Sequence, residues 1–277
     1  MGSDIIFVGG CMRSGTTLLH RTLCQTEASN PFIQASFYLT RQLEIYQRTL
    51  QQGDDFIADM FGDRDGLTAF TIAIIKRLLR VIRERWDNPE VLVLKQTEIT
   101  RFIPLLAELI PEALFVVSVR DPRDTVCSML EVGERHAKQQ QNSIYSRLGR
   151  NVGALSEVYN NMYRPLIQAC EASSDLKRKT NFVRYEDLAR SAKPTITKLA
   201  DFTSLPLQAF AETESYRPEP SRSTIRSHPY WGAYTTNLTG SPISSESVGK
   251  YRLKLTQPEI SVVESTCAGM MARFGYE

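Results

Sequence analysis

An apolar segment that leads through a glycine-rich turn into a helix constrains this 277-residue chain more than any other feature. Residues 4–9 form a short apolar run ending in glycine, typical of a strand buried on both faces. Residues 9–17 (GGCMRSGTT) form the turn, and apolar residues continue at helical spacing over 18–24. In such a turn the backbone N–H groups converge on an anion, and the helix N-terminus adds positive potential. The first prediction is therefore a phosphate-binding loop.

The rest of the chain alternates strand-like and helical segments. Further short apolar runs lie at 91–94, 114–119 and 181–185. Long amphipathic stretches lie between and around them, at 37–51, 67–86, 100–110 and 143–172. Strands that alternate with helices pair in parallel through right-handed crossovers. We therefore expect a three-layer α/β fold of the P-loop type, a central parallel sheet flanked by helices, with ligands bound outside the carboxyl ends of the strands.

The length of the chain lies at the upper end of what one hydrophobic core supports, so we expect residues 1–277 to form a single domain. Residues 36–90 and 210–247 are expected to be substrate-facing insertions or loops. The second of these loses apolar periodicity and is rich in Ser, Thr, Pro and Arg. A long stretch of this kind in a compact domain is usually a functional loop. A helical pattern over 256–274 closes the chain.

Composition excludes several classes of protein. Thirty-three Lys and Arg balance 31 Asp and Glu, for a net charge of +2, which does not suit a dedicated nucleic-acid binder. No apolar run approaches the roughly 20 residues that a membrane helix needs, and we expect no signal peptide. Five cysteines without a CxxC pair are expected to be free thiols, which favours a cytoplasmic protein. The oligomeric state stays open, with a homodimer as one option.

The turn differs from a Walker A loop in the position of its cation. From Gly10 the sequence runs G-x-x-x-x-G-T-T, so Thr16 stands where a Walker A loop has its lysine. The cation is instead Arg13, inside the loop. An arginine fork there suits a terminal anion that lies over the crown of the loop.

A second anion site is predicted after the strand at 114–119. The strand delivers Arg120 at its carboxyl end, and Pro122 and Asp124 suit the start of a helix. Ser128, eight residues beyond Arg120, is placed to face the same anion. A capping turn with a surface arginine is the simpler alternative. Two anion sites on neighbouring strand ends would together describe one nucleotide with phosphates at both ends.

The first loop, GCMRSGTTLL, resembles the 5′-phosphosulfate loop of sulfotransferases that use 3′-phosphoadenosine 5′-phosphosulfate (PAPS). Its arginine form is most similar in style to tyrosylprotein sulfotransferases and related bacterial enzymes. The resemblance implies that the 5′ end of the cofactor is bound by Arg13, Ser14, Gly15, Thr16 and Thr17.

The second motif, RDPRDTVCS, resembles the 3′-phosphate signature of the same family. By this resemblance Arg120 and Ser128 grip the 3′-phosphate that distinguishes PAPS from ATP.

Shorter motifs assign further roles by resemblance. Tyr185 in VRYEDL corresponds to a tyrosine that contacts the nucleotide, and Lys95 to a strand-end lysine that stabilises the transferring group. Ser223 corresponds to a catalytic serine, although its distance from the next motif is longer here. Gly249 and Lys250 correspond to a C-terminal element that covers the cofactor. The implied catalytic residues are Arg13, Lys95 and Ser223.

The implied reaction moves a sulfuryl group in line from PAPS to a hydroxyl or amine acceptor and leaves 3′,5′-adenosine bisphosphate. Positioning and preorganised positive charge would carry such a transfer, as in phosphoryl transfer. We expect no metal, since no histidine lies at ligand spacing from another or from a cysteine.

The general base stays unassigned. Gln34 falls near the position where relatives carry a Glu or His, and it cannot accept a proton. The candidates are Glu98, Glu44, His20 and His136. Glu98 is preferred because it should lie near the carboxyl edge of the sheet. For His20 a polar contact on the first helix is favoured, and for His136 a solvated surface.

Two other classes of function stay open. One is a P-loop kinase or nucleotide hydrolase with a degenerate loop, and the other is a non-catalytic nucleotide-binding module. The basic run at 76–85 is read as a solvated helix face, with an anionic acceptor or a membrane surface as the alternative partner.

Overall fold

The predicted parallel sheet is present in the computed structural model, which describes residues 3–34, 37–213, 230–235 and 243–277. Its four strands are all parallel and run in the order β2-β1-β3-β4. Each predicted strand lies within one residue of its observed bounds, which are β1 (Ile5–Gly10), β2 (Leu92–Lys95), β3 (Leu114–Val119) and β4 (Thr180–Arg184).

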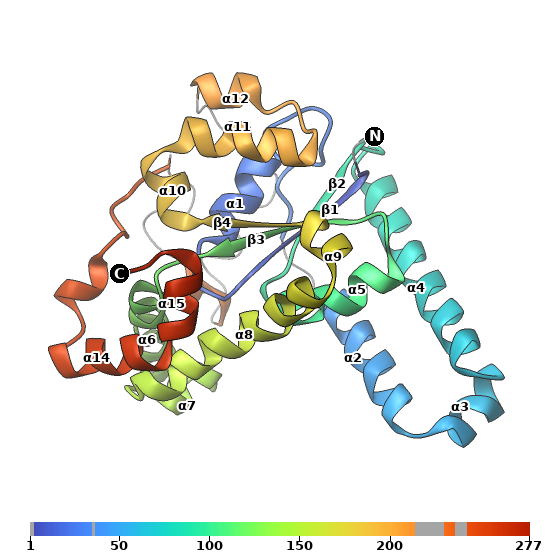
Figure 1. The fold of residues 1–277 in the computed structure, drawn as a ribbon, viewed down its shortest axis with the longest axis horizontal. Helices are drawn as coiled ribbons and strands as arrows, with labels where there is room; N and C mark the ends of the chain where they lie inside the picture. Colours follow the sequence, from blue (N-terminus) through green and yellow to red (C-terminus); the bar gives the residue numbers. More distant parts are fainter. Residues whose placement is uncertain (1–2, 35–36, 214–229, 236–242) are drawn as a thin grey trace.

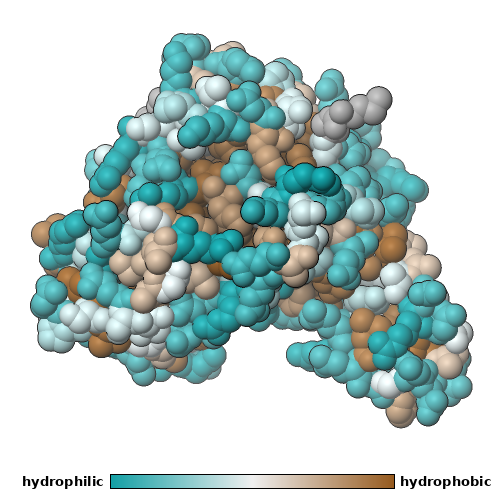
Figure 2. Space-filling model, in the orientation of Figure 1, coloured by the Kyte–Doolittle hydropathy of each residue, from teal (hydrophilic) through white to brown (hydrophobic). Residues whose placement is uncertain are grey.

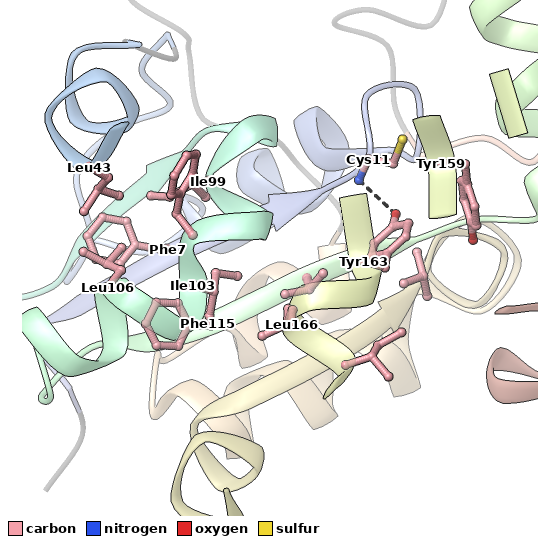
Figure 3. Close-up of a cluster of buried hydrophobic side chains, with 14 of the residues drawn as sticks. Phe7, Cys11, Leu43, Ile99, Ile103, Leu106, Phe115, Tyr159, Tyr163 and Leu166 are labelled. Carbon is pink, nitrogen blue, oxygen red and sulfur yellow. Dashed lines mark hydrogen bonds between the residues drawn. The ribbon is translucent and has the colours of Figure 1, made fainter. Parts of the chain in front are cut away.

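Helices cover both faces of this sheet, as predicted (Figure 1). Successive residues of β1 alternate between the two faces because strand side chains have a period of two. Phe7 stacks on Phe115 at 6.1 Å on the face covered by α5 (Ile103–Leu109) and α8 (Val152–Ala172), and Figure 3 shows this core. Val8 lies on the other face, beneath α1 (Thr16–Leu23) and α11 (Ala192–Thr203).

The remaining elements connect and extend these layers. The described residues include the 3₁₀ helices η1 (Thr97–Phe102), η2 (Trp231–Tyr234) and η3 (Lys250–Leu253). The further α-helices are α2 (Tyr38–Gln51), α3 (Asp54–Phe61), α4 (Arg64–Arg85), α6 (Pro122–Lys138), α7 (Ile144–Leu148), α9 (Ser174–Lys179), α10 (Tyr185–Arg190), α12 (Gln208–Thr213), α14 (Gln257–Thr266) and α15 (Ala268–Phe274). Within the described ranges, no helix is long and apolar enough to cross a membrane.

Several helix boundaries differ from the predictions for local reasons. The predicted helix over 143–172 is broken into α7 and α8 at Gly149, which has a φ of 52°. Helix α4 begins earlier than residue 67 because the Asp63 carboxylate caps it, accepting a hydrogen bond from the Gly66 amide at 2.7 Å. Short helices between residues 174 and 213 escaped the periodicity analysis because most span less than two turns.

Helices α2, α3 and α4 form an arm that extends from the body of the molecule (Figures 1 and 2). The arm has buried residues of its own, including Leu43, Ile57 and Ile75. It lies within residues 36–90, which were predicted to be a substrate-facing insertion.

A tyrosine from α8 ties the glycine-rich loop to β3. The Tyr163 hydroxyl accepts a hydrogen bond from the Cys11 amide at 2.9 Å and donates one to the Ser118 carbonyl at 2.8 Å (Figure 3). Both bonds are buried, so the loop is held against the sheet by a group that solvent cannot replace.

Replacing this hydroxyl tests how much the loop depends on it. We expect Tyr163→Phe to lower the free energy of unfolding by about 1–3 kcal/mol, because the buried Cys11 amide loses its acceptor and the Ser118 carbonyl loses one of its donors. Tyr46→Phe is the matched control, since the Tyr46 hydroxyl forms a hydrogen bond with the Thr68 hydroxyl in the arm at 2.9 Å, away from the loop. Urea unfolding of both variants measures the difference, and an equal loss in both would contradict the account.

Candidate functional site

The loop between β1 and α1 has the backbone of a phosphate cradle. Gly15 caps α1 in the left-handed conformation, with a φ of 92°, and a Cβ there would lie 2.4 Å from the Tyr185 ring. At Gly10, which has a φ of 132°, a Cβ would lie 2.5 Å from the Ser118 carbonyl oxygen. Both positions therefore require glycine, as the sequence pattern predicted.

Three amides at the start of α1 remain available to a ligand. The N–H groups of Gly15, Thr16 and Thr17 donate to no acceptor within the described part of the chain. No acidic residue lies in the first turn of the helix to compete for them. Unpaired amides at a helix N-terminus bind anions, so this geometry supports the predicted loop site.

Ser14 has a structural part in this loop. Its hydroxyl donates to the Cys11 carbonyl at 2.6 Å, and its amide donates to the same carbonyl at 3.1 Å. The Ser118 hydroxyl in turn donates to the Ser14 carbonyl at 2.6 Å. Ser14 therefore shapes the loop and fixes it to β3, while its neighbours carry the free amides.

Arg13 joins the two predicted anion sites. Its Nε donates to the Ser128 hydroxyl of α6 at 3.0 Å, and its Nη1 donates to the Tyr234 carbonyl at 2.6 Å. Burial, followed by the nearby cations Arg120 and Arg135, lowers the pKa of the Arg13 guanidinium to about 10. Neighbouring cations that lower one another's pKa in this way favour the binding of an anion among them.

Lys95 ends β2 on the same side of the sheet. Its Nζ lies 3.4 Å from the Thr17 hydroxyl, so the ammonium and the loop amides face one region. Burial lowers the pKa of Lys95 to about 8, with a further contribution from Arg13. The structure thus brings together Lys95, Arg13 and Thr17, which the sequence placed on two separate motifs.

Arg120 is the buried link between the loop and the C-terminal turn. Its Nη1 donates to the Arg13 carbonyl at 3.1 Å, and its Nη2 donates to the Ser247 carbonyl. The guanidinium stacks on the Tyr185 ring, with its carbon 4.7 Å from the ring centroid. No acceptor among the residues that the structure describes satisfies its buried Nε, which leaves one donor for a ligand.

Asp124 is the residue of this region that the sequence analysis missed. Its carboxylate accepts hydrogen bonds from the Gly249 amide at 2.7 Å and the Tyr251 amide at 2.9 Å, and it lies 3.8 Å from Arg120. Burial raises the pKa of this carboxyl. The sequence suggested only a helix start at this position, although the second acid in RDPRD was the available signal.

The C-terminal turn is therefore held against Arg120 and α6. Gly249 adopts a φ of 76°, which allows the turn into η3. Lys250 is exposed, and its Nζ lies 3.4 Å from Glu131 of α6.

The four candidates for a general base differ in their burial and in their hydrogen-bond and ion-pair partners. Glu98 is half-buried on η1 and makes no hydrogen bond or ion pair with any residue of the described ranges. Burial raises the pKa of Tyr234, with smaller contributions from Tyr230 and Glu98, so Glu98 lies within electrostatic reach of the segment that contacts Arg13. Glu44 is engaged by Arg41 at 2.5 Å and by Arg101 at 3.2 Å.

Both histidine candidates are buried. His20 contacts the Val93 carbonyl at 3.2 Å, as favoured, and burial together with Lys95 lowers its pKa to about 3. The prediction for His136 is wrong, because the ring is fully buried between Tyr230 and Tyr234. Helix α6 turns His136 inward, where its Nε2 contacts the Tyr230 carbonyl at 3.0 Å. Ser223 lies outside the described residues.

Across the described ranges, no group of three or more His, Cys, Asp or Glu side chains could hold a metal ion. All five cysteines are buried, and none forms a disulfide in the described part of the chain.

Comparison with known proteins decides the family. A sequence model of the sulfotransferase family matches residues 4–209, which include β1, the loop, β3 and β4. The chain belongs to the sulfotransferase family. The predicted family is thus confirmed, and the region matched contains Arg13, Lys95 and Arg120.

Individual relatives of this sulfotransferase match over part of their length. Human carbohydrate sulfotransferase 2 is 27% identical over 170 residues, which are 61% of this chain and 31% of that protein. The mouse protein of the same name is 28% identical over the same shares. The chain therefore matches about a third of the length of these curated relatives.

Solved structures confirm the fold of the sulfotransferase. The sulfotransferase domain from the curacin biosynthetic pathway superposes with a TM-score of 0.59 at 16% identity, over 99% of this chain and 98% of that one. Mouse sulfotransferase SULT7A1, solved with PAP, has a TM-score of 0.54 at 12% identity, over 97% of this chain and 85% of that one. Sulfotransferase STF9 from Mycobacterium avium has a TM-score of 0.57 at 15% identity, over 100% and 78%.

The position of Asp124 makes a prediction about nucleotide binding. The asparagine of Asp124→Asn has one side-chain oxygen where the aspartate has two. Either its NH₂ group faces one of the Gly249 and Tyr251 amides, or its one oxygen must accept hydrogen bonds from both amides. We expect the Kd of 3′,5′-adenosine bisphosphate to rise about tenfold, which corresponds to about 1.4 kcal/mol, because the turn over the site is released. The Kd of AMP, which lacks the 3′-phosphate, should change little.

Isothermal titration calorimetry with both nucleotides measures this selectivity. Glu134→Gln is the matched control, since this exposed carboxylate lies on the same helix, 3.9 Å from Arg150. Equal weakening of AMP and the bisphosphate would show that Asp124 supports the fold alone.

Proposed function

We propose that this sulfotransferase moves the sulfuryl group of PAPS to a hydroxyl or amine acceptor. The observation that carries the proposal is the contact of Arg13 with Ser128, reinforced by the contact of Arg120 with the Arg13 carbonyl. These contacts join a loop with free amides to a second cationic site. One ligand with anionic groups at both ends fits this pair of sites better than a triphosphate does.

In this proposal each end of the nucleotide has its own set of residues. The amides of Gly15, Thr16 and Thr17 hold the 5′-phosphosulfate. Arg120 and Ser128 hold the 3′-phosphate, and Tyr185 contacts the nucleotide. The turn that contains Gly249 and Lys250 covers it. The buried, unpartnered Nε of Arg120 supports this assignment, because a buried donor of this kind is costly unless a ligand satisfies it.

Transfer in this site depends on fixed positive charge. Arg13 and Lys95 stabilise the charge that builds on the equatorial oxygens of the sulfuryl group and on the departing phosphate. The bond from sulfur to the phosphate oxygen breaks as the bond to the acceptor oxygen or nitrogen forms, and the acceptor proton passes to a base. We assign that base to Glu98, a half-buried carboxylate of η1 that makes no hydrogen bond or ion pair within the described ranges and that contributes to the raised pKa of Tyr234. Ser223 stays a prediction, and the scheme uses no metal.

The kinase or hydrolase alternative is not favoured. Thr16 occupies the position of the Walker A lysine, and its side chain is buried at the start of α1.

The two segments 36–90 and 210–247 are proposed to shape the acceptor site. A cytoplasmic location stays a prediction.

Removal of the loop cation tests the catalytic role directly. We expect Arg13→Ala to lower kcat for sulfuryl transfer from PAPS to a phenol by about 10²–10³-fold, because a preorganised charge is lost from the transition state. The bisphosphate should still bind through Arg120 and the loop amides. Arg101→Ala, which removes an exposed partner of Glu44, is the control and should retain activity. Undiminished turnover in Arg13→Ala would overturn the catalytic assignment, and absence of turnover in the unaltered protein with every acceptor class would favour a binding module.

The lowered pKa of Lys95 predicts the pH dependence of binding. Only the protonated ammonium attracts the anion, and in the free protein it loses its proton as pH rises through about 8. The affinity for the bisphosphate should therefore fall above this pH, by up to tenfold per pH unit. In Lys95→Arg the side chain keeps its charge over this range. The affinity of this variant for the bisphosphate should therefore stay nearly constant between pH 7.5 and 9.5, at about the value of the unaltered protein at low pH. An unchanged slope in Lys95→Arg would assign the titration to another group.

A further inference from the structure

The 3₁₀ helix η2 is held by two consecutive residues near the end of α6. The Arg135 Nε donates a hydrogen bond to the Ala233 carbonyl at 2.8 Å, and the His136 Nε2 lies 3.0 Å from the Tyr230 carbonyl. Since a carbonyl oxygen can only accept, the His136 Nε2 is the donor, and the ring carries its hydrogen on that nitrogen. These two contacts fix the first and the last part of a single helical turn.

Aromatic rings pack η2 against the same helix. The His136 ring stacks on the Tyr230 ring, with the centroids 4.7 Å apart, and it meets the Tyr234 ring edge-on at 5.2 Å between centroids. The Tyr145 ring of α7 adds a second edge-on contact with Tyr234, at 6.4 Å. His136 and Tyr145 are buried, as is Ala233 within η2. Because aromatic pairs have preferred geometries, this packing gives η2 a defined position on α6.

The end of η2 in turn contacts the cation of the phosphate loop. The Tyr234 carbonyl accepts a hydrogen bond from the Arg13 Nη1 at 2.6 Å, and the Ser128 hydroxyl of α6 accepts one from the Arg13 Nε at 3.0 Å. A guanidinium is planar and has five N–H donors, so bonds from two different nitrogens fix its plane and use only two of the five donors. The plane of the Arg13 guanidinium is therefore set by one contact with α6 and one with η2.

Helix α6 thus controls both contacts of this guanidinium. Ser128 binds Arg13 directly. Arg135 and His136, about two turns further along α6, act on it through η2. The proposed transfer uses Ser128 and leaves Arg135 and His136 without a role.

We propose that Arg135 and His136 are positioning residues, which hold η2 so that its last carbonyl orients the Arg13 guanidinium toward the transferring sulfuryl group. The inference rests on the proposed function, since it concerns the direction of the catalytic charge. Fixed charge is most effective when it is oriented before the reaction, because a cation that must turn during the reaction loses part of its stabilising effect. His136 serves in this role as a buried N–H donor and not as a base.

A role in packing alone is the competing explanation. Substitution of His136 would then lower kcat by the same factor whether or not the Arg13 side chain is present. If His136 acts through the Arg13 guanidinium, its substitution has little left to disturb once that side chain is removed. Double-mutant kinetics therefore separate the two explanations.

His136→Phe tests the coupling, because it keeps an aromatic ring and removes the N–H donor. We expect kcat for sulfuryl transfer from PAPS to a phenol to fall about tenfold, the factor that one hydrogen bond of ordinary strength supplies, with little change in the Kd of 3′,5′-adenosine bisphosphate. In the Arg13→Ala background the same substitution should leave kcat nearly unchanged. His136→Gln keeps an N–H donor at the end of its side chain and should recover most of the activity. Equal falls in kcat in both backgrounds would overturn the proposal.

Arg135→Lys is a second variant, which should perturb folding less because Arg135 is only half-buried. It keeps the positive charge and removes the Nε that binds the Ala233 carbonyl. The same pattern is expected, with a lower kcat in the otherwise unaltered protein and little further effect beside Arg13→Ala. An undiminished kcat in both Arg135→Lys and His136→Phe would contradict the proposal.

The reactivity of Arg13 toward phenylglyoxal, mapped by mass spectrometry of peptides, tests the positioning without turnover. A guanidinium released from the Tyr234 carbonyl should be modified about tenfold faster in His136→Phe than in the unaltered protein. His20→Phe is the matched control, since His20 is equally buried and its Nε2 lies 3.2 Å from another backbone carbonyl, that of Val93. This control should leave the rate of Arg13 modification unchanged.

The rates of modification also separate this proposal from the proposed function. Equal rates at Arg13 in the unaltered protein and in His136→Phe would overturn the positioning role, as would an equal increase in His20→Phe. If the unaltered protein transfers no sulfuryl group while Arg13 reacts faster in His136→Phe, the proposed function fails and the orientation of Arg13 by His136 stands.

Discussion

The buried guanidinium of Arg120 is the contact on which the rest of the site depends. It lies where β3 ends, and it joins the phosphate loop, through the Arg13 carbonyl, to the C-terminal turn, through the Ser247 carbonyl. The Asp124 carboxylate lies 3.8 Å from this guanidinium and balances its charge. It also accepts hydrogen bonds from the Gly249 and Tyr251 amides of the same turn. The loop between β1 and α1, the C-terminal turn and helix α6 are therefore linked through the Arg120 guanidinium. A change in one of them alters the contacts of the other two.

Positive charge accumulates in this unit beyond what folding alone requires. Burial and neighbouring cations lower the pKa of both Arg13 and Lys95, so the free protein holds these groups at an electrostatic cost. A ligand with two anionic ends would relieve that cost at both sites. In the proposed function, the same cluster of cations attracts the nucleotide and stabilises the transferring group.

The sequence predicted most of the scaffold and the glycine positions of the loop between β1 and α1. The strands at β1 and β3 are short apolar runs without competing signals, and the loop between β1 and α1 requires glycine at Gly10 and Gly15 for steric reasons that a pattern records. The contacts of Asp124 and His136 escaped prediction, because each depends on a segment more than 90 residues away along the chain.

Thermal unfolding with three nucleotides tests the account most directly: 3′,5′-adenosine bisphosphate, AMP, and ADP with Mg²⁺. A ligand at a hundred times its Kd stabilises the folded state by about 2.7 kcal/mol, which a melting curve resolves easily. The account predicts a large shift with the bisphosphate and a much smaller one with AMP, because only the bisphosphate reaches both the loop and Arg120. A preference for ADP with Mg²⁺ would contradict the two-anion site and favour a nucleotide kinase or hydrolase.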